Sequence, residues 1–378
     1  MSKIGIGVVG AGGRSQVLQG VATDSRIDIR AVTDISPDRL KWFRDQVSAT
    51  ARTYTDLEAM LAQKDVNAVA IMSPDSLHEE HAMAALQAGK HIYLEKPMAT
   101  SIEACDRIIV AAAKAHRQVT VGLNMRFMPM FKRMRDIIRR GDIGDIKAVW
   151  VRHFVGRGGD YYFHDWHARR ANVFSLMLQK ASHDLDMIHW LTGHQTLRVA
   201  GFGGLDYFGG ALPDDLRCPN CDQQRSCPEY SDNERTLCAF RSAVDVEDNE
   251  MAILELAGGI RGAYLQCQFA AEYHRNFTII GTEGRIENYE PDANIVIRRR
   301  HLTNRPPVDD EVIHVEADPG HQEADRELLA TWIESLISGG GAPVSMVDGR
   351  LSVAVGVKIA ESIRQGGNPL MVPAYVPV

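Results

Sequence analysis

The side chains in this sequence that are best placed for proton transfer are those of Glu95 and Lys96, which precede Pro97. Residues 92–94 are apolar and follow a turn signal at Gly89, so they are predicted to form a strand. Pro97 must end it because proline cannot donate to a ladder. Lys96 is therefore expected at a strand's carboxyl end, where open α/β sheets bind ligands and a lysine can have its pKa tuned for proton transfer. The alternative is a solvated ion pair between Glu95 and Lys96.

A glycine-rich turn supplies the second candidate site. It follows an apolar, strand-like stretch and consists of Gly10, Ala11, Gly12, Gly13, Arg14 and Ser15. Glycines between a strand and a helix let the backbone approach a pyrophosphate at the start of the helix, predicted here over residues 16–23. Ser15 occupies the third position of the G-x-G-x-x-G pattern, so the match is imperfect. We predict cofactor contacts from Gly10, Gly12, Gly13, Arg14 and Ser15.

A carboxylate follows the second predicted strand, residues 28–33. This residue, Asp34, lies about twenty residues beyond the glycine turn, where an acid can accept hydrogen bonds from an adenosine ribose. No basic residue follows it immediately, although Arg39 is nearby, so NAD is favoured over NADP as the cofactor. The alternative is that Asp34 caps a helix before Pro37.

Strands and helices alternate through this part of the chain. The predicted helices cover residues 56–63, 77–88 and 102–116, and the further predicted strands cover residues 68–72 and 119–121. The alternation predicts a parallel, doubly wound sheet. Ser73, Pro74 and His78 come just after a strand's carboxyl end, so we expect them to line the cofactor cleft. A histidine such as His78 is otherwise a common helix-start residue.

Composition excludes several classes of protein. The chain has 378 residues, 45% of them hydrophobic, and a formal net charge of -7. That length suits two domains with ample core. The negative charge and the lack of a basic run argue against a nucleic-acid partner. No apolar run approaches the ~20 residues that span a membrane, and the first strand does not resemble a secretion signal, so a cytoplasmic protein is expected.

The chain resembles the glucose-fructose oxidoreductase and inositol dehydrogenase family, the Gfo/Idh/MocA proteins. The resemblance rests on the glycine turn, Asp34, residues 85–91 leading into Glu95-Lys96-Pro97, residues 124–127 and residues 281–284. It implies a Rossmann domain, residues 1–123, and an α+β domain on an open, mostly antiparallel sheet, residues 124–378. It also implies cofactor contacts from Glu95, Lys96 and Asn124, and a substrate contact from Arg126.

A loop dense in aromatic and polar side chains covers residues 156–167, and we name it the aromatic loop. Aromatic faces with interleaved hydrogen-bond donors suit a polyhydroxylated ring, which has apolar faces and a hydroxyl rim. The resemblance places a substrate site nearby, so Tyr161, Trp166 and His167 are predicted to bind substrate. The alternative is a loop that simply folds over the core.

The resemblance also points to His183 and Lys180. Many relatives carry Asp-x-x-x-His here, whereas this chain has Gln179 at the acid position and resembles a subgroup with Lys-x-x-His. Lys180 and His183 can face one way on a helix. A lone histidine on a helix is more often structural. Because Glu95-Lys96-Pro97 also occurs in this chain, we predict that Lys96, His183 and Lys180 are catalytic. The sequence does not decide whether Asp184 or Asp186 supports His183.

Four of the six cysteines fall in a polar stretch, residues 214–241, that we name the cysteine segment. Cys218 and Cys221 form a Cys-x-x-Cys pair, and Cys227 and Cys238 follow. Thiolates bind zinc tetrahedrally and can hold a loop that lacks its own core. Structural zinc on these four residues and reduced, partly buried thiols remain alternatives, because the spacing is irregular.

The remaining sequence supplies strands, helices and an expected contact surface. Strands are predicted over residues 146–153, 251–256, 262–269, 277–280, 285–289 and 294–299, and helices over residues 128–140, 323–337 and 347–364. Alternation in several strands fits a sheet with one face turned to water or a partner. Relatives commonly pair such sheets, so a homodimer or homotetramer is expected.

The sequence therefore predicts an NAD-dependent oxidoreductase that transfers a hydride between a secondary hydroxyl of a sugar, glycoside or cyclitol and nicotinamide. Its small-molecule substrate would be a carbohydrate or polyol. One alternative is an enzyme that cleaves or isomerises a glycoside through transient NAD redox chemistry. Another is a non-catalytic, NAD-binding regulator, against which the presence of Lys96, Lys180 and His183 argues.

Overall fold

Two sheets organise the structure, which is a computed structural model describing residues 3–289, 293–301, 303, 306, 309–316 and 321–377. The first compact unit consists of Met1–Met128, Asp318–Val353 and Tyr375–Val378. The second consists of Pro129–Ala317 and Ala354–Ala374. The division at residue 123 that the sequence suggests stays a prediction.

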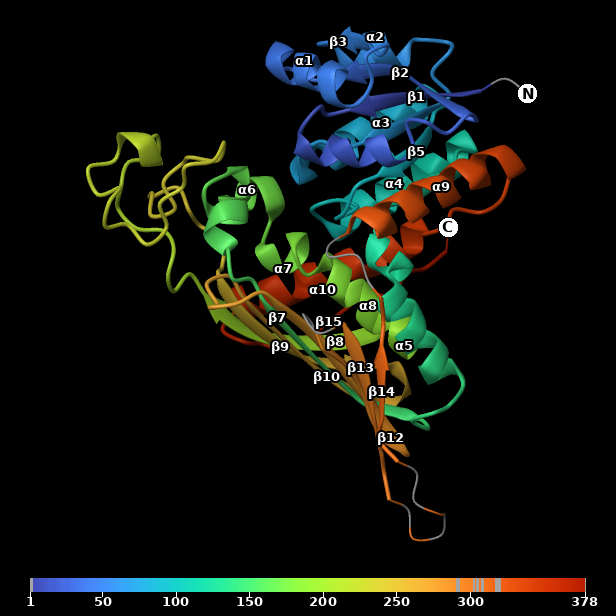
Figure 1. Ribbon diagram of the computed structural model, residues 1–378, viewed down its shortest axis with the longest axis vertical. Coiled ribbons are helices and arrows are strands. Elements are labelled where there is room, and N and C mark those ends of the chain that lie inside the picture. The colour runs from blue at the N-terminus through green and yellow to red at the C-terminus, as the bar shows by residue number, and fades with distance from the viewer. Residues whose placement is uncertain are drawn as a thin grey trace. The chain divides into compact units, whose positions relative to one another are not determined.

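The first unit contains a six-stranded parallel sheet in the order β3-β2-β1-β4-β5-β6 (Figure 1). Its strands are β1 (Ile4–Val9), β2 (Ile27–Thr33), β3 (Arg52–Tyr54), β4 (Ala68–Ile71), β5 (His91–Leu94) and β6 (Val119–Val121). Its α-helices include α1 (Pro37–Gln46), α2 (Leu57–Leu61), α3 (His78–Gln87), α4 (Ile102–Ala115) and α9 (Gln322–Ser338). Every residue of β4 is buried, as expected for a parallel sheet covered on both faces. The predicted doubly wound Rossmann sheet is confirmed.

Helix α4 shows how local sequence sets the element ends. Its N-cap is Ser101, whose Oγ accepts a hydrogen bond from the backbone of Ala104 at 3.2 Å. The helix ends at His116 in a left-handed conformation, φ 52°.

The first helix differs from its prediction. The structure has a 3-10 helix, η1 (Gly13–Gly20), which begins inside the glycine turn, instead of a helix over residues 16–23. Both the backbone N–H and the Oγ of Ser15 donate to the carbonyl of Gly12, at 2.9 and 2.7 Å. These short-range bonds favour the tighter winding of a 3-10 helix at this position.

Helix α9 belongs to the same compact unit as the first sheet, although it lies near the other end of the sequence. It packs against η1 and against η3 (Asn124–Phe127). Trp332 is fully buried, and its ring centroid lies 5.6 Å from that of Tyr93 on β5. The packing of α9 therefore supports both the glycine turn and the strand that leads to Lys96.

The second unit is built on a nine-stranded sheet in the order β14-β13-β12-β11-β7-β10-β9-β8-β15. The strands are β7 (Ile146–Phe154), β8 (Thr196–Gly204), β9 (Asn249–Leu256), β10 (Ile260–Cys267), β11 (His274–Gly281), β12 (Gly284–Tyr289), β13 (Asn294–Arg299), β14 (Glu311–His314) and β15 (Leu370–Met371). β7 and β10 run parallel, and the other described neighbours run antiparallel. The predicted open, mostly antiparallel sheet is confirmed.

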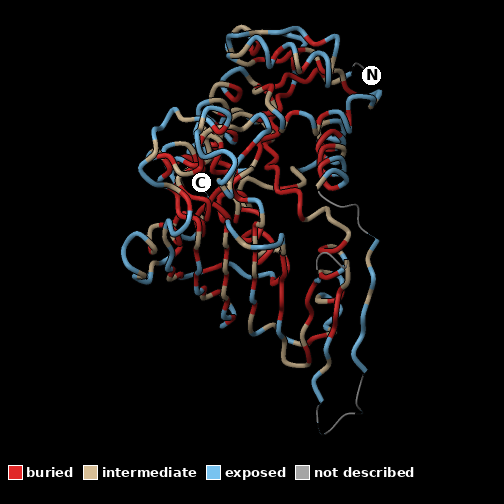
Figure 2. The backbone as a smooth tube through the Cα atoms, turned by 60° about the vertical axis from the view of Figure 1, so that its left-hand side comes forward, coloured by how far each residue is buried: buried red, intermediate tan, exposed pale blue. Residues whose placement is uncertain are grey.

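One face of this sheet carries helices, as Figure 1 shows for α5 (Pro129–Arg139), α8 (Ser182–Thr192) and α10 (Met346–Arg364). Helix α5 buries Met130, Phe131, Met134 and Ile137, which helical spacing places along one stripe. Phe131 meets Phe277 of β11 edge to face, with ring centroids 5.1 Å apart. In Figure 2, buried and exposed stretches alternate along several strands, so the opposite face retains exposed side chains.

The cysteine segment and the aromatic loop share a small core in the second unit. Its members come from both stretches and from the chain around them: Val155, Tyr162, Phe163, Ala168, Val173, Leu176, Phe208, Ala239, Val244 and Val246. The rings of Phe163 and Phe208 stack with their centroids 3.9 Å apart. This shared core holds the aromatic loop against the segment that follows β8.

Arg241 fastens the two stretches together. Its side chain is 2% exposed, and its guanidinium donates to the carbonyls of Phe163, Cys238 and Asp165, the last at 3.0 Å. Arg235 adds an ion pair to the side chain of Asp165 at 3.1 Å. The cysteine segment therefore fixes the backbone of the aromatic loop, including the residues beside Trp166.

Replacing Arg241 by methionine should destabilise this region, because three backbone carbonyls, two of them in buried hydrogen bonds, lose their donor. We expect Arg241→Met to lower the free energy of unfolding by about 2–4 kcal/mol and to speed amide hydrogen exchange in the aromatic loop. The matched control is Arg225→Met, since Arg225 is an exposed arginine of the same segment. Unchanged protection of residues 156–167 in Arg241→Met would contradict this account.

Candidate active site

The glycine turn leaves space for a ligand above its backbone. Gly10 has φ +93°, and a Cβ there would lie 2.9 Å from the carbonyl of Met72, so this position requires glycine. A Cβ on Gly13 would meet no atom within 4 Å, and one on Gly12 would meet only Arg39, at 3.4 Å. The open backbone of Gly12 and Gly13 fits the close approach of a pyrophosphate.

Asp34 lies beside the glycine turn. One carboxylate oxygen accepts the backbone N–H of Ala11 at 2.8 Å, and the other accepts the backbone N–H of Ser36 at 2.9 Å. Ser36, not Asp34, is the N-cap of α1. The carboxylate thus lies at the end of β2 with the turn around it, which is the position that a ribose-binding acid needs.

Arg14 joins the glycine turn to two carboxylates. Its Nε donates to Glu95 at 2.8 Å, and its two terminal nitrogens donate to Asp325, each at 2.7 Å. Asn124 also donates to Asp325, at 2.6 Å. Burial alone would lower the pKa of the guanidinium, but Glu95 and Asp325 outweigh it, and the pKa lies well above its usual value. Three predicted cofactor residues, Arg14, Glu95 and Asn124, are therefore brought together.

Asp325 is a residue that the sequence-based reasoning missed. It is 3% exposed and lies in the first turn of α9, more than three hundred positions from Arg14 in the sequence. No local pattern marks it, because an acid in a first helical turn is common and is usually explained by the helix dipole. Only the packing of α9 against η1 shows its partners.

The turn after β4 is tied to the residue after Lys96. The ring nitrogens of His78 lie 2.7 Å from the carbonyl of Pro97 and 2.9 Å from that of Ser73. Burial lowers the pKa of His78 to about 4, so the ring is neutral near pH 7 and donates to one carbonyl at a time. Pro74 precedes the short helix η2 (Asp75–Leu77). Ser73, Pro74 and His78 thus lie next to the Lys96–Pro97 peptide, and their contact with a cofactor stays a prediction.

Arg126, predicted to bind substrate, forms an ion pair with Asp348 at 2.9 Å. Burial alone would raise the pKa of Asp348, but the nearby guanidinium outweighs it and the pKa is lowered. Arg126 lies in η3, directly after Asn124 and Met125. Arg126 therefore follows Asn124, which bonds the same Asp325 as Arg14 does, by two residues. The side chain of Arg126 is 12% exposed.

The second unit carries the other two predicted catalytic residues. Helix α7 (Leu176–Gln179) ends before Lys180, and His183 lies in the first turn of α8. The ammonium of Lys180 lies 5.6 Å from the ring centroid of Tyr162 and 5.9 Å from that of Tyr273. His183 is 8% exposed. The helical structure is interrupted between α7 and α8, so Lys180 and His183 do not lie on one continuous helix.

Asp184 anchors the start of α8 in the sheet below. Its carboxylate is 2.7 Å from His153 Nδ1, accepts the hydroxyl of Tyr264 at 2.8 Å, and lies 3.3 Å from Arg275. Burial alone would raise the pKa of Asp184, but Arg275 and His153 outweigh it, and the pKa falls below its usual range. The Asp184 carboxylate is thus bonded to three residues of the sheet. Its role is to hold the start of α8, and with it His183, against the sheet.

The aromatic loop presents stacked rings. It contains a short π-helical turn, Gly159–Phe163. Trp166 and His167 stack with their centroids 3.7 Å apart, and Tyr162 meets His167 edge to face at 5.4 Å. Tyr161 is 54% exposed. The predicted substrate residues of this loop therefore form one aromatic cluster, whose contact with substrate stays a prediction.

The structure does not support the predicted zinc site. In the described part of the chain, no group of three or more His, Cys, Asp or Glu side chains is arranged to hold a metal ion. Cys218 and Cys238 are buried, whereas Cys221 and Cys227 are partly exposed, and all four are free thiols. Burial raises the pKa of both Cys218 and Cys238, which keeps them protonated. The structure thus favours the alternative of reduced, partly buried thiols.

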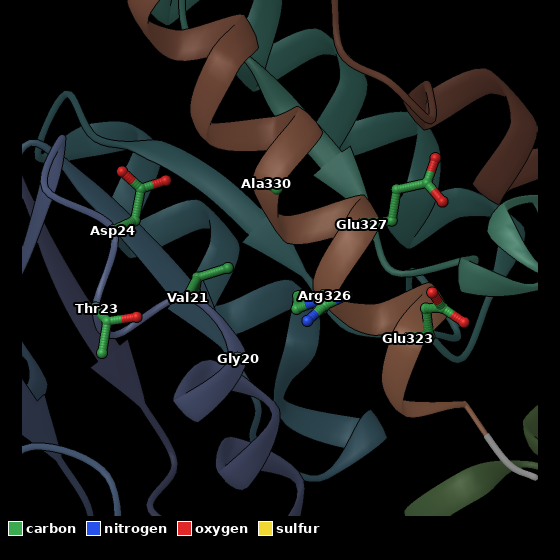
Figure 3. A pocket seen from close by; sticks show the side chains of 8 residues that line it. All are labelled: Gly20, Val21, Thr23, Asp24, Glu323, Arg326, Glu327 and Ala330. Carbon is green, nitrogen blue, oxygen red and sulfur yellow. The ribbon is translucent and has the colours of Figure 1, made fainter. Parts of the chain in front are cut away.

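A pocket of about 370 Å³ in the first unit lies outside the candidate site. Figure 3 shows its lining, which α9 and the end of η1 supply: Gly20, Val21, Thr23, Asp24, Glu323, Arg326, Glu327 and Ala330. None of the predicted site residues lines it. Its acidic side chains would repel a pyrophosphate, so we do not assign it to the cofactor.

Several known proteins are similar to this chain in sequence or in fold. Inositol 2-dehydrogenase 2 of Saccharopolyspora erythraea is 26% identical over 367 residues, which is 96% of this chain and 94% of that protein. The putative oxidoreductase YteT of Bacillus subtilis is 26% identical over 302 residues, 70% of each chain. A levoglucosan dehydrogenase solved with NADH and levoglucosan has the same fold, with a TM-score of 0.80 and 20% identity over 98% of this chain and 100% of that one.

Family models account for most of the sequence. The model described as an oxidoreductase family with an NAD-binding Rossmann fold matches residues 4–123. The model of the family's C-terminal alpha/beta domain matches residues 135–372. None of the helices in the described ranges is long and apolar enough to cross a membrane. The chain belongs to the Gfo/Idh/MocA oxidoreductase family, with an NAD-binding Rossmann fold followed by the family's C-terminal α/β domain.

Proposed function

We propose that this protein is an NAD-dependent dehydrogenase that acts on a secondary hydroxyl of a sugar, glycoside or cyclitol. The observation that carries the proposal is the bond from Arg14 of the glycine turn to Glu95, the residue before Lys96. It ties the predicted nucleotide-binding turn to the predicted base. The similarity to an inositol 2-dehydrogenase over nearly the whole chain supports a polyol as substrate.

The nucleotide would be held by the first unit. Gly12 and Gly13 offer open backbone to the pyrophosphate, and Asp34 offers a carboxylate to the adenosine ribose. Arg14 holds the turn and the strand end in place through its bonds to Glu95 and Asp325, and Asn124 bonds the same Asp325. When bound, a nicotinamide supplies a hydride acceptor.

Three side chains would manage the proton of the reacting hydroxyl. A carbinol carbon gives up a hydride only as its hydroxyl loses a proton, so a base must lie within hydrogen-bond reach of that oxygen. Lys96, at the carboxyl edge of the sheet, is the proposed base. His183 and Lys180 would share the task of orienting the hydroxyl or passing the proton on. Tyr161, Trp166 and His167 offer aromatic faces to the ring of the substrate.

A screen of sugars and cyclitols with NAD tests the activity, and two variants test the roles. The variants are assayed with the substrate that the screen identifies. Lys96→Ala and His183→Ala should each lower kcat by about 10²-fold to 10⁴-fold, the usual loss on removing a general acid or base. Both variants should still bind NAD in calorimetry. Controls are Lys114→Ala and His194→Ala, which alter exposed residues.

Absorbance of the reduced nicotinamide separates the alternatives. A dehydrogenase accumulates NADH, an enzyme that uses transient redox chemistry returns to NAD in each turnover, and a regulator does neither. Near-normal turnover by Lys96→Ala would show that the Glu95-Lys96 pair is structural.

We also propose that NAD binds more tightly than NADP. A carboxylate at position 34 would repel the 2′-phosphate of NADP, whereas the guanidinium of Arg39, near Gly12, would attract it. Calorimetry should give the lower Kd for NAD. Asp34→Asn should reduce the difference between the Kd values of NAD and NADP. Arg39→Ala should increase that difference, because it weakens the binding of NADP alone. Tighter binding of NADP by the unaltered protein would contradict the assignment.

An exposed apolar face on the second sheet supports the expectation of a homo-oligomer. On β10, Ala263 pairs with Trp150 of β7 on one side and with Ile253 of β9 on the other. Two residues further along β10, Leu265 pairs with Met251 of β9. These side chains form one patch. Ile253 is 64% exposed and Trp150 47%. Such a patch usually marks a protein interface.

The charges around this patch favour a second copy of the same chain as its binding partner. Ion pairs formed by Arg198 and Arg261 with Glu255 lie near the patch. A surface with both signs of charge can match its own copy across a two-fold axis. We therefore propose a homodimer, or a homotetramer that contains this contact.

Charge on the patch should break the assembly. Ile253→Asp should shift the mass measured by light scattering from a multiple of the chain mass toward that of one chain, since burying an unpaired carboxylate is costly. Val110→Asp is the control, because Val110 is an exposed apolar residue on α4. An unaltered protein that runs as a monomer at all concentrations would contradict the proposal.

A further inference from the structure

Tyr273 is an aromatic residue of the second unit that lies beside a predicted catalytic group and that the sequence-based reasoning missed. It directly precedes β11 and is 48% exposed. The ammonium of Lys180 lies 5.9 Å from the ring centroid of Tyr273 and 5.6 Å from that of Tyr162. Both distances lie in the range of a cation–π interaction, in which the negative face of a ring attracts a cation. Two rings from separate parts of the chain therefore share one cation.

Both tyrosines are attached to the aromatic loop. Tyr162 belongs to this loop, is 8% exposed, and meets His167 edge to face at 5.4 Å. Tyr273 lies outside the loop, but the first glycine of the loop packs directly against its backbone. A Cβ on Gly156 would lie 2.9 Å from the backbone nitrogen of Tyr273, closer than a side chain can approach. The loop that we propose to bind substrate therefore begins in contact with the backbone of Tyr273.

The ring of Tyr273 also contacts the side chains that anchor α8. It meets His153 edge to face, with centroids 5.7 Å apart, and the guanidinium of Arg275 lies 6.0 Å from its centroid. His153 and Arg275 are both bonded to the buried carboxylate of Asp184. Tyr273 thus links the ammonium of Lys180 to the group of residues that fixes the start of α8.

We propose that Tyr273 is a positioning residue that, together with Tyr162, holds the ammonium of Lys180 where it acts on the substrate. The proposal rests on the proposed function, in which Lys180 orients the reacting hydroxyl or passes its proton on. A lysine side chain is a flexible stem, so its ammonium must be held in place if it is to act on one oxygen atom. The face of a ring attracts the ammonium without taking up its proton, so the rings position Lys180 and leave proton transfer to it.

A double-mutant cycle tests the proposal with the substrate that the screen identifies. Tyr273→Leu should lower kcat by about 2-fold to 30-fold, the loss that one cation–π contact allows, with little change in KM. Tyr273→Phe keeps the ring and should retain most of the activity. With Lys180→Met already present, Tyr273→Leu should have no further effect, because the group through which it acts is gone.

The control for the cycle is Tyr230→Leu, since Tyr230 is an exposed tyrosine of the cysteine segment. This variant should keep normal kcat. An equal loss from Tyr273→Leu with and without Lys180 would make Tyr273 a structural residue and overturn the proposal.

A readout without substrate keeps this test separate from that of the function. Reductive methylation with isotope-labelled formaldehyde leaves lysines charged and gives each an NMR signal, and Lys180→Arg identifies the signal of Lys180. Ring currents shift nuclei above an aromatic face upfield, so this signal should lie upfield of those of exposed lysines. It should move downfield in Tyr273→Leu and stay in place in Tyr273→Phe.

The two failures can be told apart. A signal of Lys180 that does not move in Tyr273→Leu overturns the proposal whether or not a polyol is oxidised. A moved signal without any turnover would support the placement of Lys180 by Tyr273 and contradict only the proposed function.

Discussion

The ion pairs of Arg14 are the interaction on which the nucleotide-binding unit depends. The guanidinium of Arg14, whose side chain is 35% exposed, bonds the buried carboxylates of Glu95 and Asp325, and so joins the glycine turn, the end of β5 and helix α9. Removing this arginine would leave two buried carboxylates without their cation, which is destabilising. The position of Lys96 therefore depends on a helix that lies more than two hundred residues further along the chain.

The second unit also contains a buried carboxylate that is paired with an arginine, at the start of helix α8. Asp184 is fully buried, and Arg275, His153 and Tyr264 from three strands hold its carboxylate. This arrangement fixes the start of α8, where His183 lies. In both units a buried carboxylate bonded by an arginine lies next in sequence to a predicted catalytic side chain, Lys96 or His183. Such an arrangement would give the proposed active site the preorganised geometry that catalysis needs.

Sequence patterns predicted the regular elements well, because strands such as β4 and helices such as α4 carry their signals locally. The 3-10 helix η1 was mispredicted as a later helix, because the bonds that Ser15 makes to Gly12 outweigh the apolar pattern that follows. Zinc was suggested by cysteine spacing, which does not report how deeply each thiol is buried. Asp325 could not be found from sequence, and the choice between Asp184 and Asp186 stayed open there, since the roles of these residues depend on partners that only the fold brings close. The substrate and the cytoplasmic location stay predictions.

In the proposed function, the nicotinamide of a bound nucleotide lies against Lys96, at the carboxyl edge of the first sheet. The most direct measurement is a crystal structure of the protein with NAD. It should show the pyrophosphate over Gly12 and Gly13, the adenosine ribose at Asp34, and the amine of Lys96 within about 4 Å of the nicotinamide, close enough to reach a hydroxyl bound beside it. A nicotinamide bound away from Lys96, with the pyrophosphate over Gly12 and Gly13 and the ribose at Asp34, would contradict the central claim.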